Sequence, residues 1–275
     1  MDRGAATTTA RAGTAASYRC EIATSSRAAA ATSPGTAPSF LSFEDRASDS
    51  PLVERIWRSR SSEAGSFTSV AASHWEMVVT RLQGTTTITV RGPETKPTSA
   101  ECPADGEWIG VRFRVGTFMP QLPVVRVMDR QDVELPAASR RAFWLGGSAI
   151  EYPDFENAEA FVQRLLDGGW IGRDPVVDAV VNGRVESMAT STRTLQRRFL
   201  RATGLTIGAH RQIERARLAA RLLGEGVPIL AVVHRAGYFD QAHLTRSLRS
   251  RMGHTPGQIV RGEAALSFLY KTDES

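Results

Sequence analysis

Cysteine, lysine and long apolar runs are scarce in this chain of 275 residues. Only Cys20 and Cys102 occur, which excludes a disulfide framework and any metal cluster built on several cysteines. No apolar run is long enough to span a membrane, and the N-terminal segment lacks the apolar core of a secretory signal. We therefore expect a cytoplasmic protein without a membrane partner.

Catalytic motifs are also missing from the sequence. There is no evident pair of nucleophile and base, no glycine-rich loop for phosphate and no paired acid motif. We therefore expect neither enzyme activity nor a cofactor.

Positive charge is concentrated towards the C-terminus. Residues 191–261 contain thirteen Arg and no Lys against three acidic residues, a net charge of +10, whereas the rest of the chain carries −5. A basic segment beside an acidic remainder is typical of a protein that binds a polyanion. A genome that prefers Arg to Lys would explain the rarity of Lys, but not the scarcity of acids in this one stretch.

The N-terminal part combines a polar tail with a β-rich segment. Residues 1–38 have almost no large apolar side chains, so we expect a disordered tail or a start codon assigned too far upstream. Residues 39–147 carry short runs typical of strands, with Gly84 suited to a turn and prolines in the intervening loops. The runs are 75–80, 85–90 and 108–115. They predict a small, mostly antiparallel β domain.

The hydrophobic period changes after residue 147. The segment from Asp154 to Asp167 is predicted to be a helix whose apolar face comprises Phe155, Ala158, Phe161, Val162 and Leu165. We predict a helical linker over 148–172, an all-helical domain over 173–262 and a tail over 263–275. The expected fold class is therefore α+β.

The first informative helix is predicted over 192–202. Ser191 can cap its start and Gly204 can end it. Leu195, Phe199 and Ala202 would form its buried stripe. The opposite face would then carry guanidinium and amide groups, which can hydrogen-bond guanine and adenine in the major groove. An ordinary solvated face remains an alternative.

A longer helix from Thr206 to Leu223 follows and is predicted to be a rigid connector. Its core stripe comprises Ile213, Ala216, Ala220 and Leu223. Its remaining arginines are expected on the surface or facing phosphates. They are Arg211, Arg215 and Arg217.

A helix, a glycine turn and a capped helix come next. Pro228 can begin the first helix, Gly237 allows the turn, and Asp240 can cap the second helix. In that second helix the residues expected to pack inward are Leu244, Leu248 and Met252. This order is typical of a helix-turn-helix unit.

Two motifs give the sequence a specific resemblance. Residues 237–248 (GYFDQAHLTRSL), followed by 253–256 (GHTP), resemble the signature of the AraC/XylS family of transcription regulators. Residues 191–199 (STRTLQRRF), followed by 203–206 (TGLT), are similar to that family's first reading helix. The resemblance covers about 185–261.

The resemblance implies seven helices in two helix-turn-helix units, with reading helices at about 192–202 and 241–250 in successive major-groove segments. The implied base-reading residues are Arg193, Gln196 and Arg197 in the first helix and Gln241, Ala242, Thr245 and Arg246 in the second. His243 is at a family hallmark position and is expected to be structural. The implied partners are double-stranded DNA, RNA polymerase, a small effector and a second copy of the chain.

The chain departs from the family pattern before the first reading helix. The family usually has a full helix of the type Val-x-x-Leu-Ala-x-x-x-Gly there, whereas this chain has VESMA at 185–189 and reaches Ser191 almost at once. Either the helix over 175–182 supplies the missing scaffold, or the first unit is deformed.

The β domain is expected to bind an effector or to mediate dimerisation, although its effector residues are unknown from the sequence. His74, Trp75 and Glu76 adjoin a strand but are too few for a metal site, so packing or surface roles are favoured. Four tryptophans could line a pocket or simply fill the core. They are Trp57, Trp108, Trp144 and Trp170.

Two other functions stay open. An alkyl-transfer enzyme with the same DNA-binding module would need an activated cysteine, for which only Cys102 stands outside the tail. A protein-interaction module that has lost DNA binding would fit the shortened first unit.

Overall fold

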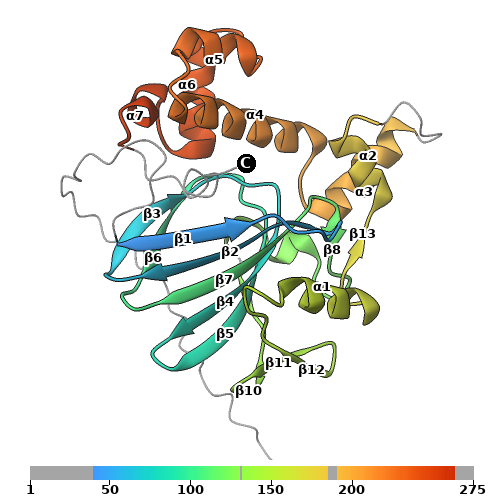
Figure 1. Cartoon of the computed structure of the whole chain (residues 1–275). Coiled ribbons are helices and arrows are strands. Elements are labelled where there is room, and N and C mark those ends of the chain that lie inside the picture. Colours follow the sequence, from blue (N-terminus) through green and yellow to red (C-terminus); the bar gives the residue numbers. More distant parts are fainter. Residues whose placement is uncertain (1–39, 131, 185–190, 264–275) are drawn as a thin grey trace, which may run out of the picture.

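The computed structural model describes residues 40–130, 132–184 and 191–263. The fold is α+β, with strands in the N-terminal part and helices in the C-terminal part (Figure 1). The main sheet is antiparallel, in the strand order β1-β2-β7-β4-β5-β9. Its strands are β1 (Leu41–Arg46), β2 (Val53–Ser61), β7 (Glu107–Phe113), β4 (Glu76–Leu82), β5 (Thr85–Arg91) and β9 (Val133–Glu134).

Three smaller sheets accompany the main sheet. They are β3 (Gly65–Ser69) with β6 (Thr98–Cys102), β8 (Thr117–Phe118) with β13 (Gly172–Arg173), and the meander β10 (Ala137–Ser139), β11 (Ala142–Leu145) and β12 (Ser148–Glu151). Two short 3-10 helices, η1 (Val124–Arg126) and η2 (Met128–Arg130), lie between β8 and β9.

The three predicted strands are confirmed as β4, β5 and β7. Gly84 adopts a φ of +75° in the turn between β4 and β5, a conformation that glycine tolerates best. Strands β3 and β6 were not predicted. Because their residues are mostly small and polar, their pairing leaves little trace in the hydrophobic pattern.

Helix α1 (Ala158–Asp167) begins four residues later than the sequence pattern predicts. Asp154 Oδ1 accepts hydrogen bonds from the backbone N–H groups of Glu156 and Asn157, which holds a turn ahead of the helix. Phe155 is nevertheless buried, in the same core as the inner faces of α1 and the main sheet. The segment expected to be a helical linker therefore contributes β12 and α1 to the β domain's core.

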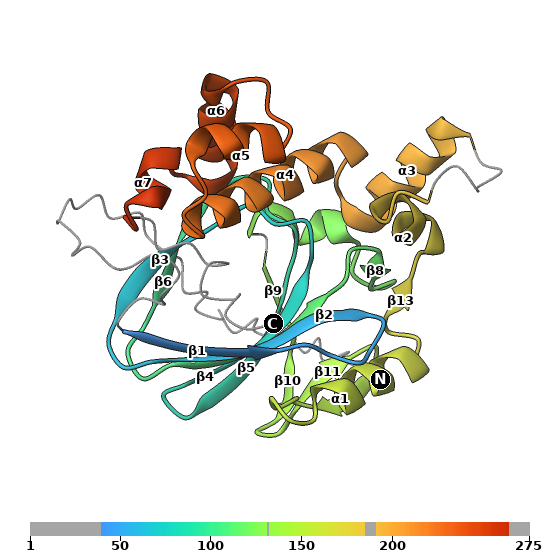
Figure 2. The same cartoon turned by 45° about the horizontal axis from the view of Figure 1, so that its top comes forward.

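In the described parts of the chain from residue 174 onward, six helices form the C-terminal domain. They are α2 (Pro175–Val181), α3 (Thr192–Thr203), α4 (Ile207–Gly224), α5 (Ile229–Arg235), α6 (Gln241–Met252) and α7 (Pro256–Val260). Their apolar faces share a second core, which also takes in Val70 and Ala71 from the β domain. Figure 2 shows α4 lying over the curved sheet, with α5, α6 and α7 at one end and α2 and α3 at the other.

Asp174, at the boundary between the two domains, forms hydrogen bonds with both α2 and α3. Its carboxylate caps α2 by accepting from Val176 N and also accepts from Arg198 of α3 at 3.0 Å. We expect Asp174→Ala to lower the free energy of unfolding by about 1–2 kcal/mol, since a lost cap costs about 0.5–2 kcal/mol. Denaturant unfolding measures the change.

Asp174→Asn is the matched control, because its amide oxygen can still cap the helix while the charge is lost. The Asn variant should be clearly more stable than the Ala variant. Equal losses in both variants would show that the contact to Arg198, rather than the cap, carries the effect.

Candidate DNA-binding interface

The first candidate reading helix, α3, is built as its sequence predicts. Ser191 Oγ accepts from the Thr194 N–H at its start, and Gly204 ends it in a left-handed conformation with a φ of +70°. Leu195, Phe199 and Ala202 are buried, which confirms the predicted stripe. The helix therefore has a fixed orientation relative to the core.

The outer face of α3 is exposed to solvent. Arg193, Gln196 and Arg197 all lie there, so the structure brings the three predicted reading residues onto one accessible surface. Two forked guanidinium groups and an amide at this spacing can reach neighbouring base edges. Their contact with bases remains a prediction.

Helix α2 supports α3 within the helical domain. It packs against α3 and buries Val176, Val177 and Val180 in the shared core. Its scaffold role agrees with the first of the two alternatives raised by the sequence. The VESMA segment at 185–189 lies outside the described residues.

The second unit consists of α5, a turn and α6. Gly237 has a φ of +68° in the turn, and Asp240 Oδ1 caps α6 by accepting from His243 N at 2.6 Å. The three residues predicted to pack inward are fully buried. They are Leu244, Leu248 and Met252.

The exposed side of α6 carries three of its four predicted reading residues. Gln241, Ala242 and Arg246 are exposed, whereas Thr245 is half-buried and its hydroxyl donates to Gln241 O at 2.8 Å. The side chain of His243 packs edge-on to Tyr238, with ring centroids 5.1 Å apart. That packing supports the structural interpretation of His243.

Phe239 is a surface feature that the sequence pattern did not single out. Its side chain is 91% exposed, directly before the cap of α6. A large apolar residue is normally predicted to be buried, so only the orientation of the turn reveals this position. Phe239 therefore lies beside Gln241 and Ala242 at the exposed end of α6.

Helix α4 joins the two units and faces the β domain. Its predicted stripe is buried, as are Ala219 and Leu222. Arg211 is exposed as expected, but Arg215 and Arg217 are turned inward. The guanidinium of Arg215 lies 4.6 Å from the centre of the Tyr238 ring and donates to Gly237 O, so it supports the second unit's turn.

The helical domain is fastened to the β domain at both ends. Near α6, Ala71 N donates to Arg251 O at 2.9 Å, and Arg251 Nη1 donates to Thr95 O at 2.5 Å. Near α3, a Cβ on Gly204 would touch the side chains of Met128 and Val124. The β domain therefore contacts the C-terminal ends of both candidate reading helices.

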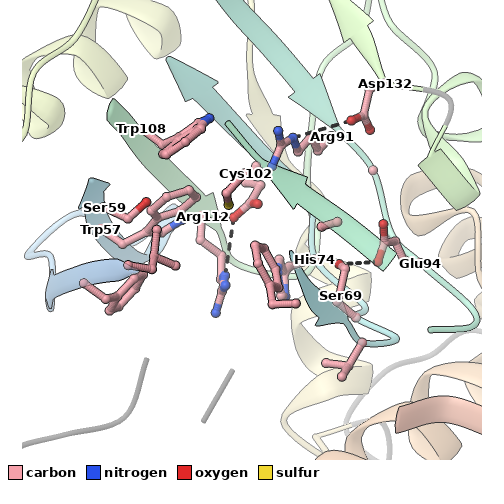
Figure 3. Close-up of a pocket in the computed structure, with 18 of the residues that line it drawn as sticks. Trp57, Ser59, Ser69, His74, Arg91, Glu94, Cys102, Trp108, Arg112 and Asp132 are labelled. Carbon is pink, nitrogen blue, oxygen red and sulfur yellow. Dashed lines mark hydrogen bonds and ion pairs between the residues drawn. The ribbon is translucent and has the colours of Figure 1, made fainter. Parts of the chain in front are cut away.

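A cavity lies in the β domain between the main sheet and the β3–β6 pair, and Figure 3 shows the side chains around it. His74 and Glu76 both line it, whereas Trp75 is buried in the core, where it stacks on Phe113. Trp57 and Trp108 also line the cavity. By contrast, Trp144 is exposed and Trp170 packs against the α1 core, so the four tryptophans do not share one pocket.

Cys102 sits in an environment that disfavours its reactive form. The side chain is buried in β6, and burial raises the pKa of its thiol, an effect that exceeds the opposing influence of Arg91. Among the described residues, no group of three or more His, Cys, Asp or Glu side chains could hold a metal ion. An alkyl-transfer reaction would need the thiolate, which this site destabilises.

Two helix-turn-helix units joined by one helix define a protein with a double helix-turn-helix domain. The helix-turn-helix domain family matches residues 185–262. No solved structure matches the chain. Within the described residues, no helix has the length and apolar character needed to cross a membrane.

Two curated proteins are similar to this chain. The HTH-type transcriptional regulator RipA of Corynebacterium glutamicum is 35% identical over 81 residues, which is 30% of this chain and 24% of RipA. The regulatory protein ada of Salmonella typhimurium is 33% identical over 173 residues, which is 61% of this chain and 48% of that protein. The chain therefore spans less than half the length of either relative.

The environment of Cys102 predicts slow reaction with thiol reagents. We expect the folded Cys20→Ser variant to react with a disulfide reagent such as 5,5′-dithiobis(2-nitrobenzoate) at least tenfold more slowly at pH 8 than the same variant does in denaturant, since the Cys102 thiolate is both scarce and covered. The Cys20→Ser background isolates Cys102. Rapid reaction of the folded variant would contradict the burial of this thiol.

Proposed function

We propose that this chain is a sequence-specific DNA-binding transcription regulator that reads two adjacent major-groove segments with α3 and α6. The proposal rests on a feature that the two helices share. Each buries an apolar stripe and presents polar or cationic side chains on its outer face. Both are attached to α4, so they can act as one unit.

Electrostatics supports the same proposal. The net charge of +10 over residues 191–261 favours association with phosphate, which supplies much of the affinity of DNA-binding proteins. Exposed arginines on the reading helices beyond the base-reading set include Arg201 and Arg249. We assign these to phosphate contacts, which position a protein on the duplex without reading its sequence.

Control by a small effector is the regulation we favour, because the β domain contains a cavity and contacts the helical domain directly. Dimerisation of the β domain and contact with RNA polymerase are further proposed interactions. We propose a cytoplasmic location, because that is where a bacterial regulator of this kind meets its DNA.

Loss of a reading arginine is predicted to weaken specific binding. We expect Arg193→Ala and Arg246→Ala each to raise the Kd for an operator selected from random DNA by about 5- to 150-fold, because one base contact contributes about 1–3 kcal/mol. Gel-shift titration at fixed salt measures the change. Arg81→Ala, at an exposed position on β4, is the control and should bind like the wild type.

Binding by both mutants with wild-type affinity would contradict the proposed reading surface. Salt provides a second discriminator, because phosphate-driven binding weakens steeply as salt concentration rises. Affinity that is insensitive to salt would instead favour a protein-interaction module.

The double unit also predicts the form of the DNA site. We expect hydroxyl-radical footprinting on the selected operator to show two protected segments on one face of the duplex, about 34 Å apart, which is one helical turn. Arg193→Ala should weaken one segment and Arg246→Ala the other. A single protected segment that only Arg246→Ala affects would show that α3 does not enter the groove.

A further inference from the structure

The cavity of the β domain owes its shape to the alternation of side chains along β7. Ile109, Val111 and Phe113 point into the core shared with α1, so Trp108 and Arg112 project from the opposite face towards the cavity. Gly110 lies between them on that face. A Cβ there would lie 2.0 Å from the Trp57 indole, so only glycine lets this ring lie across the strand.

Part of the cavity wall is aromatic, and the rest is small, polar or charged. Trp57 and Trp108 belong to a small apolar cluster, against which Phe43 and Phe67 pack. The Phe43 and Trp57 rings are stacked with centroids 5.9 Å apart. The cavity has a volume of about 170 Å³. A cavity of this volume admits only a small ligand, and the rings on its wall can pack against a flat apolar body.

Arg112 is the buried cation in this apolar setting. Its side chain is only 6% exposed, its Nε forms no hydrogen bond, and the nearest carboxylate oxygen of Glu76 lies 3.8 Å from Nε. Glu76 itself accepts a hydrogen bond from Trp57 Nε1 at 3.1 Å. A buried guanidinium with an unused donor favours an additional acceptor, which a ligand oxygen can supply.

The other acidic groups of the cavity are already engaged or lie at its edge. Glu94 accepts from Ser69 Oγ at 2.7 Å, and Asp132 pairs with Arg91 at 3.5 Å. Glu101 is exposed. The donor Nε of Arg112 is therefore a buried polar atom that can still form a hydrogen bond. This donor favours an acceptor on the ligand.

A second arginine reaches the same cavity from the other domain. Arg217 belongs to α4, yet it lines the cavity together with Arg112. Its side chain is 17% exposed to solvent. Burial lowers the pKa of its guanidinium; Glu214 and Glu54 oppose this effect, and the charge of Arg112 adds to it. Arg112 and Arg217 are thus close enough for their charges to interact, and an anion that contacts both would offset their repulsion.

We propose that this cavity binds a small aromatic carboxylic acid whose carboxylate contacts both Arg112 of β7 and Arg217 of α4. A carboxylate matches the forked donors of two guanidinium groups, and the aromatic body fits the tryptophan walls. Bound in this way, the acid links the β domain to the helix that carries both reading helices. This inference rests on the proposed function for its biological meaning, but its chemistry can be tested without DNA.

The test uses the full chain and matched pairs of probes. Phenylacetate and indole-3-acetate are compared with phenylacetamide and indole-3-acetamide, which keep the shape and lose the charge. Isothermal titration calorimetry gives the Kd, and the shift in thermal unfolding midpoint gives the stabilisation. We expect at least one acid to bind at least tenfold more tightly than its amide and to raise the midpoint.

Variants separate the contributions of the two arginines. Arg112→Gln and Arg217→Gln should each remove most of the preference for acid over amide, and Arg217→Lys should keep part of it. Arg221→Gln is the matched control, because Arg221 is exposed on the next turn of α4, does not line the cavity and pairs with Glu225. It should bind the acid like the wild type.

Each remaining outcome counts against the proposal. Equal binding of acid and amide, or no saturable binding of either acid, would overturn the assignment of the ligand class. Wild-type acid binding by Arg217→Gln would place the site in the β domain alone and overturn the link to α4. The gel shift without any acid is independent: if Arg217→Gln binds the operator normally while acid binding fails, the proposed DNA-binding function stands.

Discussion

The buried stripe of α4 is the constraint on which the arrangement of this protein depends. Ile213, Ala216 and Leu223 and their neighbours place this helix in a core shared with both helix-turn-helix units. Alanines along the stripe allow close approach, and the larger side chains fill the space that remains. Because α3 and α6 both pack on this core, their outer faces have a defined separation and direction.

The same helix joins DNA binding to the β domain. Its Arg217 reaches the cavity, while Arg251 at the end of α6 forms hydrogen bonds with both domains. If the β domain binds the proposed ligand, Arg217 would connect that ligand directly to α4, on whose core both candidate reading helices pack.

Local signals in the sequence predicted much of the helical domain. Ser191 and Asp240 cap their helices as expected, because capping depends on a few adjacent residues. The apolar stripes could also be predicted from the sequence, because the 3.6-residue periodicity of a helix is a local pattern. The start of α1 was misplaced because a turn at Asp154 competes with the helix for the same backbone donors.

The sequence alone determined the α+β class, the two helix-turn-helix units and the candidate reading faces, since each depends on patterns a few residues long. Only the tertiary structure decided which tryptophans share a cavity, and that Arg217 turns towards the β domain rather than towards DNA. These features join strands and helices that are more than a hundred residues apart, as Trp57 and Arg217 are. No local pattern records such pairings, because they follow from how the two cores pack together.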